Sequence, residues 1–210
     1  MWANIRGVNA EVHRGDLPSG LGFGTSVAVD CESLGLRPDR DRLCLVQLSA
    51  GDGASHLIQF PKGQFNAPNL SALLVDPGVT KIFHYARFDM MMMRRYLGVA
   101  CAPVYCTKIA SKLVRTYTDR HGLKDLCREL LDVDLSKEQQ SSDWGADTLT
   151  SEQVTYAASD VRYLHQLKEK LDAMLAREGR TRIAEACFAF LQTRVALDLA
   201  GWMEEDIFAH

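Results

Sequence analysis

Residues 25–60 read TSVAVDCESLGLRPDRDRLCLVQLSAGDGASHLIQF, and this stretch decides the fold class. Its apolar and β-branched runs, 25–30, 43–49 and 55–60, are separated by turn-rich segments. Short runs of this composition predict strands, and strands joined by short turns predict an antiparallel meander. The first third of the chain is therefore expected to start a β-sheet.

The rest of the chain alternates strands with helices. We predict strands at 81–85 and 103–108, and helices at 87–97, 109–115, 122–131, from about 150 onward, and at 182–199. Asn69 is expected to cap a short helix that Asp76 and the two residues after it end. Thr150 and Gln153 have the spacing of a capping box. The pattern predicts an α/β fold with a mixed, five-stranded sheet flanked by helices.

The composition is that of a globular protein without a broad basic surface. Of 210 residues, 47% are hydrophobic and 24% charged, with a formal net charge of −3. Proteins that grip long duplex DNA usually carry an extended basic face, so a nucleic-acid substrate would be short or held by several subunits. No apolar run approaches the ~20 residues of a membrane span, and the N-terminus has no signal-peptide pattern. A cytoplasmic protein with no membrane contact is expected.

Six cysteines are scattered without a CxxC pair, which predicts reduced and mostly buried thiols rather than disulfides or a zinc ribbon. The methionine run at 90–93 is expected to fill the core.

Asp30 and Glu32 stand at the end of the first predicted strand. Side chains alternate across a strand, so these carboxylates share a face while Cys31 points the other way. Carboxylates ~6.6 Å apart on one face repel each other unless a cation lies between them, and oxygen ligands suit Mg²⁺ or Mn²⁺. The alternative is a solvated acidic pair before a turn.

Helices place two further acids. Asp89 falls in the first turn of a predicted helix, where a carboxylate also stabilises the helix dipole. Tyr156 and Asp160 are one helical turn apart on a single face, which could equally be packing beside a surface acid. Each acid taken alone has a structural explanation, but their order and spacing together favour one shared site.

Three segments that contain these acids resemble a known family. VAVDCESLGLRPDRDRLCLVQLS (27–49), KIFHYARFD (81–89) and SSDWGADTLTSEQVTYAASDVRYL (141–164) are similar to the DEDD exonucleases with a tyrosine, and to ribonuclease D-type proteins. The segments TKIASKLVRTYTDRHGLK (107–124) and LDLAGWMEEDIFAH (197–210), with the short length, resemble the nano-RNase C branch of that group. Cys31 departs from the usual threonine and is expected to alter packing more than chemistry.

The resemblance covers roughly residues 12–170 and implies a ribonuclease H-like exonuclease fold. It implies a single exonuclease domain over 1–210, with a core of about 12–175 and with the C-terminal helix and tail, 180–210, in oligomer contacts. A homo-oligomer is expected, an octameric ring being one such assembly. The alternative for the tail is docking on its own domain.

The resemblance also implies roles for the acids. Asp30 would bridge two divalent cations, Mg²⁺ or Mn²⁺; Glu32 and Asp160 would complete one cation site, and Asp89 would hold the other cation through water. Tyr156 would orient the attacking water, because a pKa near 10 favours positioning over general-base action.

Several residues are candidates for substrate binding, each with a structural alternative. Leu34 and Leu36 could wedge against terminal bases or pack in their turn, and Trp144 could stack on a base or anchor the core. His84 shares a motif with Asp89 but could be purely structural.

A basic stretch between 108 and 128 offers phosphate ligands. Arg120, His121 and Lys124 are the candidates within it. The alternative is a solvated helical face.

The leading prediction is a 3′→5′ exoribonuclease that acts on short RNA oligonucleotides, including dinucleotides, and releases nucleoside 5′-monophosphates. Exonuclease action on longer RNA or DNA, and a catalytically silent binding or assembly module, are the alternatives. A phosphomonoesterase is disfavoured, since no phosphatase nucleophile motif is recognisable.

Overall fold

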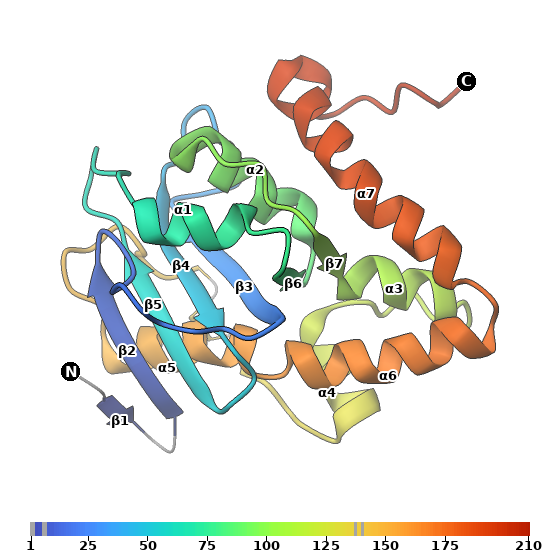
Figure 1. Cartoon of the computed structure of the whole chain (residues 1–210), viewed down its shortest axis with the longest axis horizontal. Helices are drawn as coiled ribbons and strands as arrows, with labels where there is room; N and C mark the ends of the chain where they lie inside the picture. Colours follow the sequence, from blue (N-terminus) through green and yellow to red (C-terminus); the bar gives the residue numbers. More distant parts are fainter. Residues whose placement is uncertain (1–2, 6–7, 137, 140) are drawn as a thin grey trace.

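A mixed β-sheet lies at the centre of the computed structural model, which describes residues 3–5, 8–136, 138–139 and 141–210 (Figure 1). Its strand order is β1-β2-β5-β4-β3-β6-β7. The strands are β1 (Ala3–Ile5), β2 (Val8–Arg14), β3 (Ser26–Ser33), β4 (Leu43–Ser49), β5 (Ala54–Gln59), β6 (Thr80–Phe83) and β7 (Val104–Cys106). The predicted α/β class and mixed sheet are confirmed.

The predicted number of five strands is wrong, because two N-terminal strands extend the sheet. β2 pairs in parallel with β5, and β1 pairs antiparallel with β2. β2 reads VNAEVHR, a short and largely polar alternation in which Ala10 is buried and Val12 exposed. It therefore lacks the apolar run that marks the other strands.

The predicted meander is confirmed. β3 pairs antiparallel with β4, and β4 antiparallel with β5, while β3, β6 and β7 run parallel. The helix between β6 and β7 is the crossover that a parallel pair requires.

Helices cover both faces of the sheet (Figure 1). They are α1 (Pro68–Val75), α2 (Ala86–Leu97), α3 (Thr107–Val114), α4 (Leu123–Leu131), α5 (Ser151–Arg162), α6 (Leu164–Arg177) and α7 (Thr181–Leu197). α2 packs on one face, against β3, β4 and β6, and α5 crosses the other, against β2, β5, β4 and β3. α6 packs on α3 and α4, and α7 on α2 and β7.

Helix starts agree with the sequence in one case and differ in another. At α5 the Thr150 side chain accepts from the Gln153 N–H and Gln153 reaches back, so the predicted capping box is confirmed. At α1 Asn69 is not the cap. The Asp16 carboxylate accepts from the N–H groups of Asn69 and Leu70, both at 2.9 Å, so the cap comes from a distant loop.

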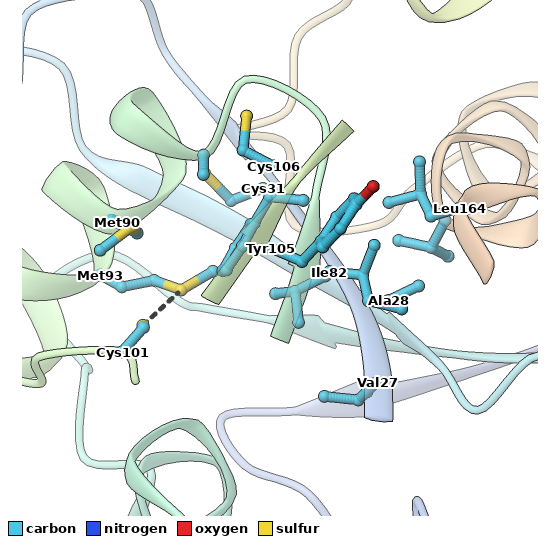
Figure 2. Close-up of a cluster of buried hydrophobic side chains, with 14 of the residues drawn as sticks. Val27, Ala28, Cys31, Ile82, Met90, Met93, Cys101, Tyr105, Cys106 and Leu164 are labelled. Atoms are coloured by element: carbon cyan, nitrogen blue, oxygen red, sulfur yellow. Dashed lines mark hydrogen bonds between the residues drawn. The ribbon is translucent and has the colours of Figure 1, made fainter. Parts of the chain in front are cut away.

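The main core lies between β3, β6, β7 and α2 (Figure 2). Met90–Met93 are all buried there, as predicted, and the Cys101 thiol lies 3.6 Å from the Met93 sulfur. All six cysteines are free and five are buried, so the predicted burial of most thiols is confirmed. A second cluster, under α5, contains Leu45, Leu57 and Trp144.

The C-terminal segment is tied to the start of α2. A π-helical turn, Asp198–Trp202, follows α7, and the buried Asp198 carboxylate accepts two hydrogen bonds from the Arg87 guanidinium, each at 2.7 Å. Arg194 pairs with the same carboxylate at 2.8 Å. Phe208 beyond the turn is largely exposed. Of the helices in the described part of the chain, none has the length and apolarity to cross a membrane.

Candidate active site

Asp30 and Glu32 lie near the end of β3 on the face that α5 covers. In the β3–β4 register they stand opposite Gln47 and Leu45, and the register shifts between Glu32 and Ser33. This irregularity ends the regular pairing just after the second acid, and strand irregularities of this kind often re-aim side chains beside active sites.

α5 brings the third carboxylate to the same place. The small residues Ala157 and Ala158 are fully buried against the sheet, so the helix approaches closely. As a result, one carboxylate oxygen from each of Asp30, Glu32 and Asp160 lies within 4.8 Å of the others. The structure therefore brings these three acids together as predicted, although Asp30 and Asp160 are 130 positions apart in the chain.

Asp89 reaches the cluster from the opposite side of β3. It is buried in the first turn of α2, which follows Tyr85 in a left-handed conformation (φ 72°). Its Oδ1 accepts a 3.1 Å hydrogen bond from the backbone N–H of Cys31, between Asp30 and Glu32. Asp89 is not part of the tight trio, but its charge is the largest charge effect on Asp30.

Burial raises the pKa of all four acids, and the charges of neighbouring acids raise it further for Asp30, Glu32 and Asp89. The pKa of Asp30 lies well above its usual range, through burial and then the charges of Asp89, Asp160 and Glu32. The pKa of Glu32 rises to about 9, through burial and then Asp160 and Asp89, and burial raises those of Asp89 and Asp160 to about 7. Four acids that resist ionisation together form a site that favours protons or a cation.

Tyr156 stands one turn before Asp160 on the same face of α5. Burial and the charges of Asp160, Glu32 and Asp30 raise the Tyr156 pKa. The hydroxyl therefore stays protonated, which fits a positioning role better than that of a free base.

A pocket of about 300 Å³ opens above three of the acids. Its lining residues come from six parts of the chain and are Asp30, Cys31, Glu32, His84, Tyr85, Lys108, Gly122, Leu123, Lys124, Leu135, Ser136, Tyr156 and Asp160. Two lysines (Lys108 and Lys124) and two tyrosines (Tyr85 and Tyr156) thus surround the carboxylates. This composition suits an anionic, aromatic ligand.

His84 lies in the pocket wall as a neutral imidazole. Burial, and then the charge of Lys108, lowers its pKa to about 3. The Thr107 hydroxyl donates to the Phe83 carbonyl at 3.1 Å, so the 2.9 Å contact between Thr107 Oγ1 and His84 Nδ1 assigns the ring proton to Nδ1. Nε2 is then the hydrogen-bond acceptor.

Some residues of the basic stretch line the pocket, and others make contacts within the fold. Lys124 lines the pocket and lies 3.4 Å from Asp134. Of the residues that the structure describes, Arg120 and His121 do not line it: Arg120 is exposed, and His121 Nδ1 lies 2.8 Å from the Ser111 hydroxyl. Arg115 is buried and pairs with Glu129, so neither phosphate binding nor the alternative of a solvated face applies at that position.

The aromatic and aliphatic candidates have opposite environments. Trp144 is only 2% exposed and packs 6.0 Å from the Tyr156 ring, centroid to centroid. Stacking of this indole on a substrate base is therefore corrected to a role as a core anchor behind Tyr156. Leu34 and Leu36 are 51% and 76% exposed, which argues against turn packing and leaves both free to touch a ligand.

Three residues of this region carry signals that the sequence reasoning missed. Gln47 stands opposite Asp30 with no exposed surface, and within the described chain neither atom of its amide has a hydrogen-bond partner. Lys108 Nζ lies 4.2 Å from the centre of the Tyr85 ring at the pocket rim. For Gln47 the sequence did carry a signal, because a glutamine in the mostly apolar strand β4 is unusual.

A tyrosine and carboxylates at the end of a mixed sheet define a class of nuclease domain, and sequence comparison agrees. The profile described as "3'-5' exonuclease" matches residues 10–176. The ribonuclease D of Acidiphilium cryptum is 35% identical over 154 residues, which are 73% of this chain and 39% of that protein. The chain thus spans well under half the length of this curated relative.

Solved structures match more of the chain. Brucella melitensis NrnC is 58% identical, with a TM-score of 0.93 over 96% of this chain and 98% of that chain. The same nuclease with bound Mg²⁺ and bound to pGG matches with TM-scores of 0.92 and 0.93. Escherichia coli RNase D is 27% identical, with a TM-score of 0.71 over 82% of this chain and 45% of that chain.

The chain belongs to the 3′→5′ exonuclease family, within the ribonuclease D superfamily and similar to its nano-RNase C members. The expected ribonuclease H-like exonuclease fold is confirmed by the same structures. Membership marks the chain as a 3′→5′ exonuclease domain, a kind of hydrolase.

Proposed function

We propose that this protein removes nucleotides from the 3′ end of short RNA oligonucleotides, dinucleotides included, and releases nucleoside 5′-monophosphates. The observation that carries the proposal is the carboxylate trio Asp30, Glu32 and Asp160, within 4.8 Å, beside Tyr156 in a small pocket. The family assignment supports exonuclease chemistry, and the substrate length is the new element.

Two divalent cations, Mg²⁺ or Mn²⁺, are part of the proposal. The donor set fits them, since every candidate ligand is a carboxylate oxygen and the raised pKa values leave the ionised cluster in need of positive charge. Asp30, Glu32, Asp89 and Asp160 would hold them. Bound cations supply a nucleophilic water and stabilise the attacking and leaving oxygens.

The remaining chemistry falls to side chains of this chain. The Tyr156 hydroxyl, held by Asp160, orients the attacking water without losing its proton. Lys108 and Lys124 balance the charge of the substrate phosphate at the pocket rim, and His84 Nε2 accepts from a sugar hydroxyl. The exposed Leu34 and Leu36 contact the terminal bases.

Short substrates are favoured by the size and surroundings of the site. A pocket of about 300 Å³ has room for about one nucleotide, at the lower limit of ligand sites. The net charge of −3 offers no broad phosphate-binding surface. Brucella melitensis NrnC bound to pGG is a relative of 58% identity, which makes pGG the first ligand to try.

Defined substrates test the proposal. Purified protein with Mg²⁺ is given RNA of two, five and twenty nucleotides and the matching DNA, and the products are resolved by chromatography. We expect dinucleotide RNA to be cleaved with the highest kcat/KM and to yield 5′-monophosphates. Equal turnover of all lengths would favour the longer-substrate alternative.

A variant pair separates catalysis from a silent binding module. Asp30→Asn should abolish nucleotide release, whereas Asp39→Asn, an exposed acid in the next loop, should not. If both variants and the wild type released no nucleotide but bound pGG equally, the chain would be a binding module.

A homo-oligomer is the second part of the proposal, an octameric ring being one closed form. Ile183 and Phe190 on α7 are exposed beside an apolar groove of about 730 Å³ between α3 and α7, and Phe208 of the tail lies against Phe190. Apolar surface of this extent favours burial by a second copy. Light scattering of the full chain and of a chain ending at residue 199 tests it: an unchanged mass would remove the tail from the interface.

A further inference from the structure

A second cluster of metal-ligand type lies on the face of the sheet opposite the carboxylates. Glu11 and His13 alternate along β2, and His56 stands beside Glu11 in the parallel β2–β5 register. The carboxylate trio faces the other way, since Asp30 pairs with Gln47, Gln47 pairs with Leu57, and Leu57 is the neighbour of His56 along β5. The two sites are therefore separated by the sheet.

The three side chains converge on one point. One donor atom from each of Glu11, His13 and His56 lies within 4.8 Å of the others, and His13 Nε2 is 2.9 Å from His56 Nδ1. In a tetrahedral zinc site with Zn–N bonds of ~2.05 Å, two nitrogen ligands are separated by about 3.3 Å. A few tenths of an ångström of opening would place an ion between these nitrogens.

The surroundings keep the cluster in place. His56 is buried, and the Phe23 ring, from the segment between β2 and β3, meets its ring edge-on at 5.8 Å between centroids. The two imidazoles are nearly parallel, 19° apart. Glu11 and His56 take part in other interactions too, which a bound ion would join or displace.

We propose that Glu11, His13 and His56 bind one divalent transition-metal ion of the Zn²⁺ class, which ties β2 to the rest of the sheet. Imidazole donors select such ions over Mg²⁺, which prefers oxygen ligands. Three protein donors leave a fourth position for water. The proposal is independent of the proposed nuclease function, because it concerns different residues on the other face.

Zn²⁺ binding is measured in an Asp30→Asn/Asp160→Asn background, which removes the carboxylate site as a competitor. Equilibrium dialysis with excess Mg²⁺ should find one Zn²⁺ per chain. His13→Gln/His56→Gln in this background should abolish it, and Glu11→Gln should weaken it by more than ~10-fold. His210→Gln, which removes an exposed histidine, is the matched control and should retain full binding.

Two further readouts keep the test decisive. Co²⁺ in place of Zn²⁺ should give the intense visible absorption of a tetrahedral nitrogen-containing site, and Zn²⁺ should raise the melting temperature only where the histidines are intact. If the double histidine variant fails to fold, the Glu11→Gln comparison decides. Equal Zn²⁺ stoichiometry with and without the histidines, or an octahedral Co²⁺ spectrum alone, would overturn the proposal.

Discussion

The backbone N–H of Cys31 donates a 3.1 Å hydrogen bond to Oδ1 of Asp89, and the charge of this carboxylate, after burial, raises the pKa of the Cys31 thiol. Cys31 therefore does two things at once. Its side chain is buried in the main core (Figure 2), and its backbone N–H orients the one acid that comes from the far side of β3. The expectation that this residue affects packing more than chemistry needs that addition.

Cys31→Val should weaken the Mg²⁺ dependence of the exonuclease. Valine keeps the apolar volume but loses the thiol donor, whose contribution we set at ~1 kcal/mol, or about five-fold in apparent Mg²⁺ affinity. Cys31→Thr retains a donor and should stay close to the wild type. The measurement is dinucleotide cleavage against Mg²⁺ concentration, with Cys187→Val as the control. Identical Mg²⁺ curves for the valine and threonine variants would show that the thiol does not matter.

Asp160→Asn should remove activity and raise the stability of the metal-free protein at about pH 8. Asparagine eliminates a carboxylate whose burial disfavours the charged form and raises the pKa to about 7, so that it is charged at pH 8. Thermal denaturation in EDTA, together with cleavage assays, measures both effects. A fall in melting temperature would mean that the carboxylate is structurally required.

Stability without metal should fall as pH rises. The folded-state pKa values of Asp89 and Asp160 are about 7 and that of Glu32 about 9, above the ~4 expected for the unfolded chain. The native state therefore binds more protons between these limits, so its stabilisation is complete below about pH 4 and is lost as pH rises through about 7 to 9.

The melting temperature measured in EDTA from about pH 5 to 9 tests this sign. Saturating Mg²⁺ should flatten the decline, because the cation takes the place of the protons. An Asp30→Asn/Asp160→Asn variant should also decline less than the wild type. A metal-free melting temperature that rises with pH would contradict the raised pKa values.

Gln47→Leu should lower kcat by about ten-fold and leave KM nearly unchanged. The buried amide beside Asp30 has no protein partner among the described residues, and such groups usually hold an ordered water. We expect that water to position the Asp30 carboxylate, so its loss affects turnover rather than binding. A purely structural role would instead leave kcat intact and change only the melting temperature, since leucine fills a similar volume.

Much of this site could be predicted because the four acids lie in segments that resemble a known family and at recognisable places in local structure. Asp30, at a strand end, and Asp160, one turn after Tyr156, follow from periodicity and spacing. Burial at a single position could not be read in this way. Trp144 and Leu36 both belong to turn-rich segments, yet one is a core anchor and the other is exposed.

Long-range partners escaped prediction for a related reason. Asp16 caps α1 from 53 residues away. β2 joins the sheet through a parallel pairing with β5, and its largely polar sequence gives no sign of that pairing. Neither relationship leaves a periodic signal, because each depends on how separate loops meet after folding.

The ion pair between Arg87 and Asp198 has a mechanical consequence. Arg87 lies two residues before Asp89 in the same helical turn, so a displacement of the segment after α7 would pull on the backbone that carries this acid. Proteolytic trimming that spares Asp198 should be silent for catalysis, whereas trimming that removes it should act like damage to the active site itself. The segment after α7 thus helps to hold the position of the Asp89 carboxylate, although the two lie more than 100 residues apart in the chain.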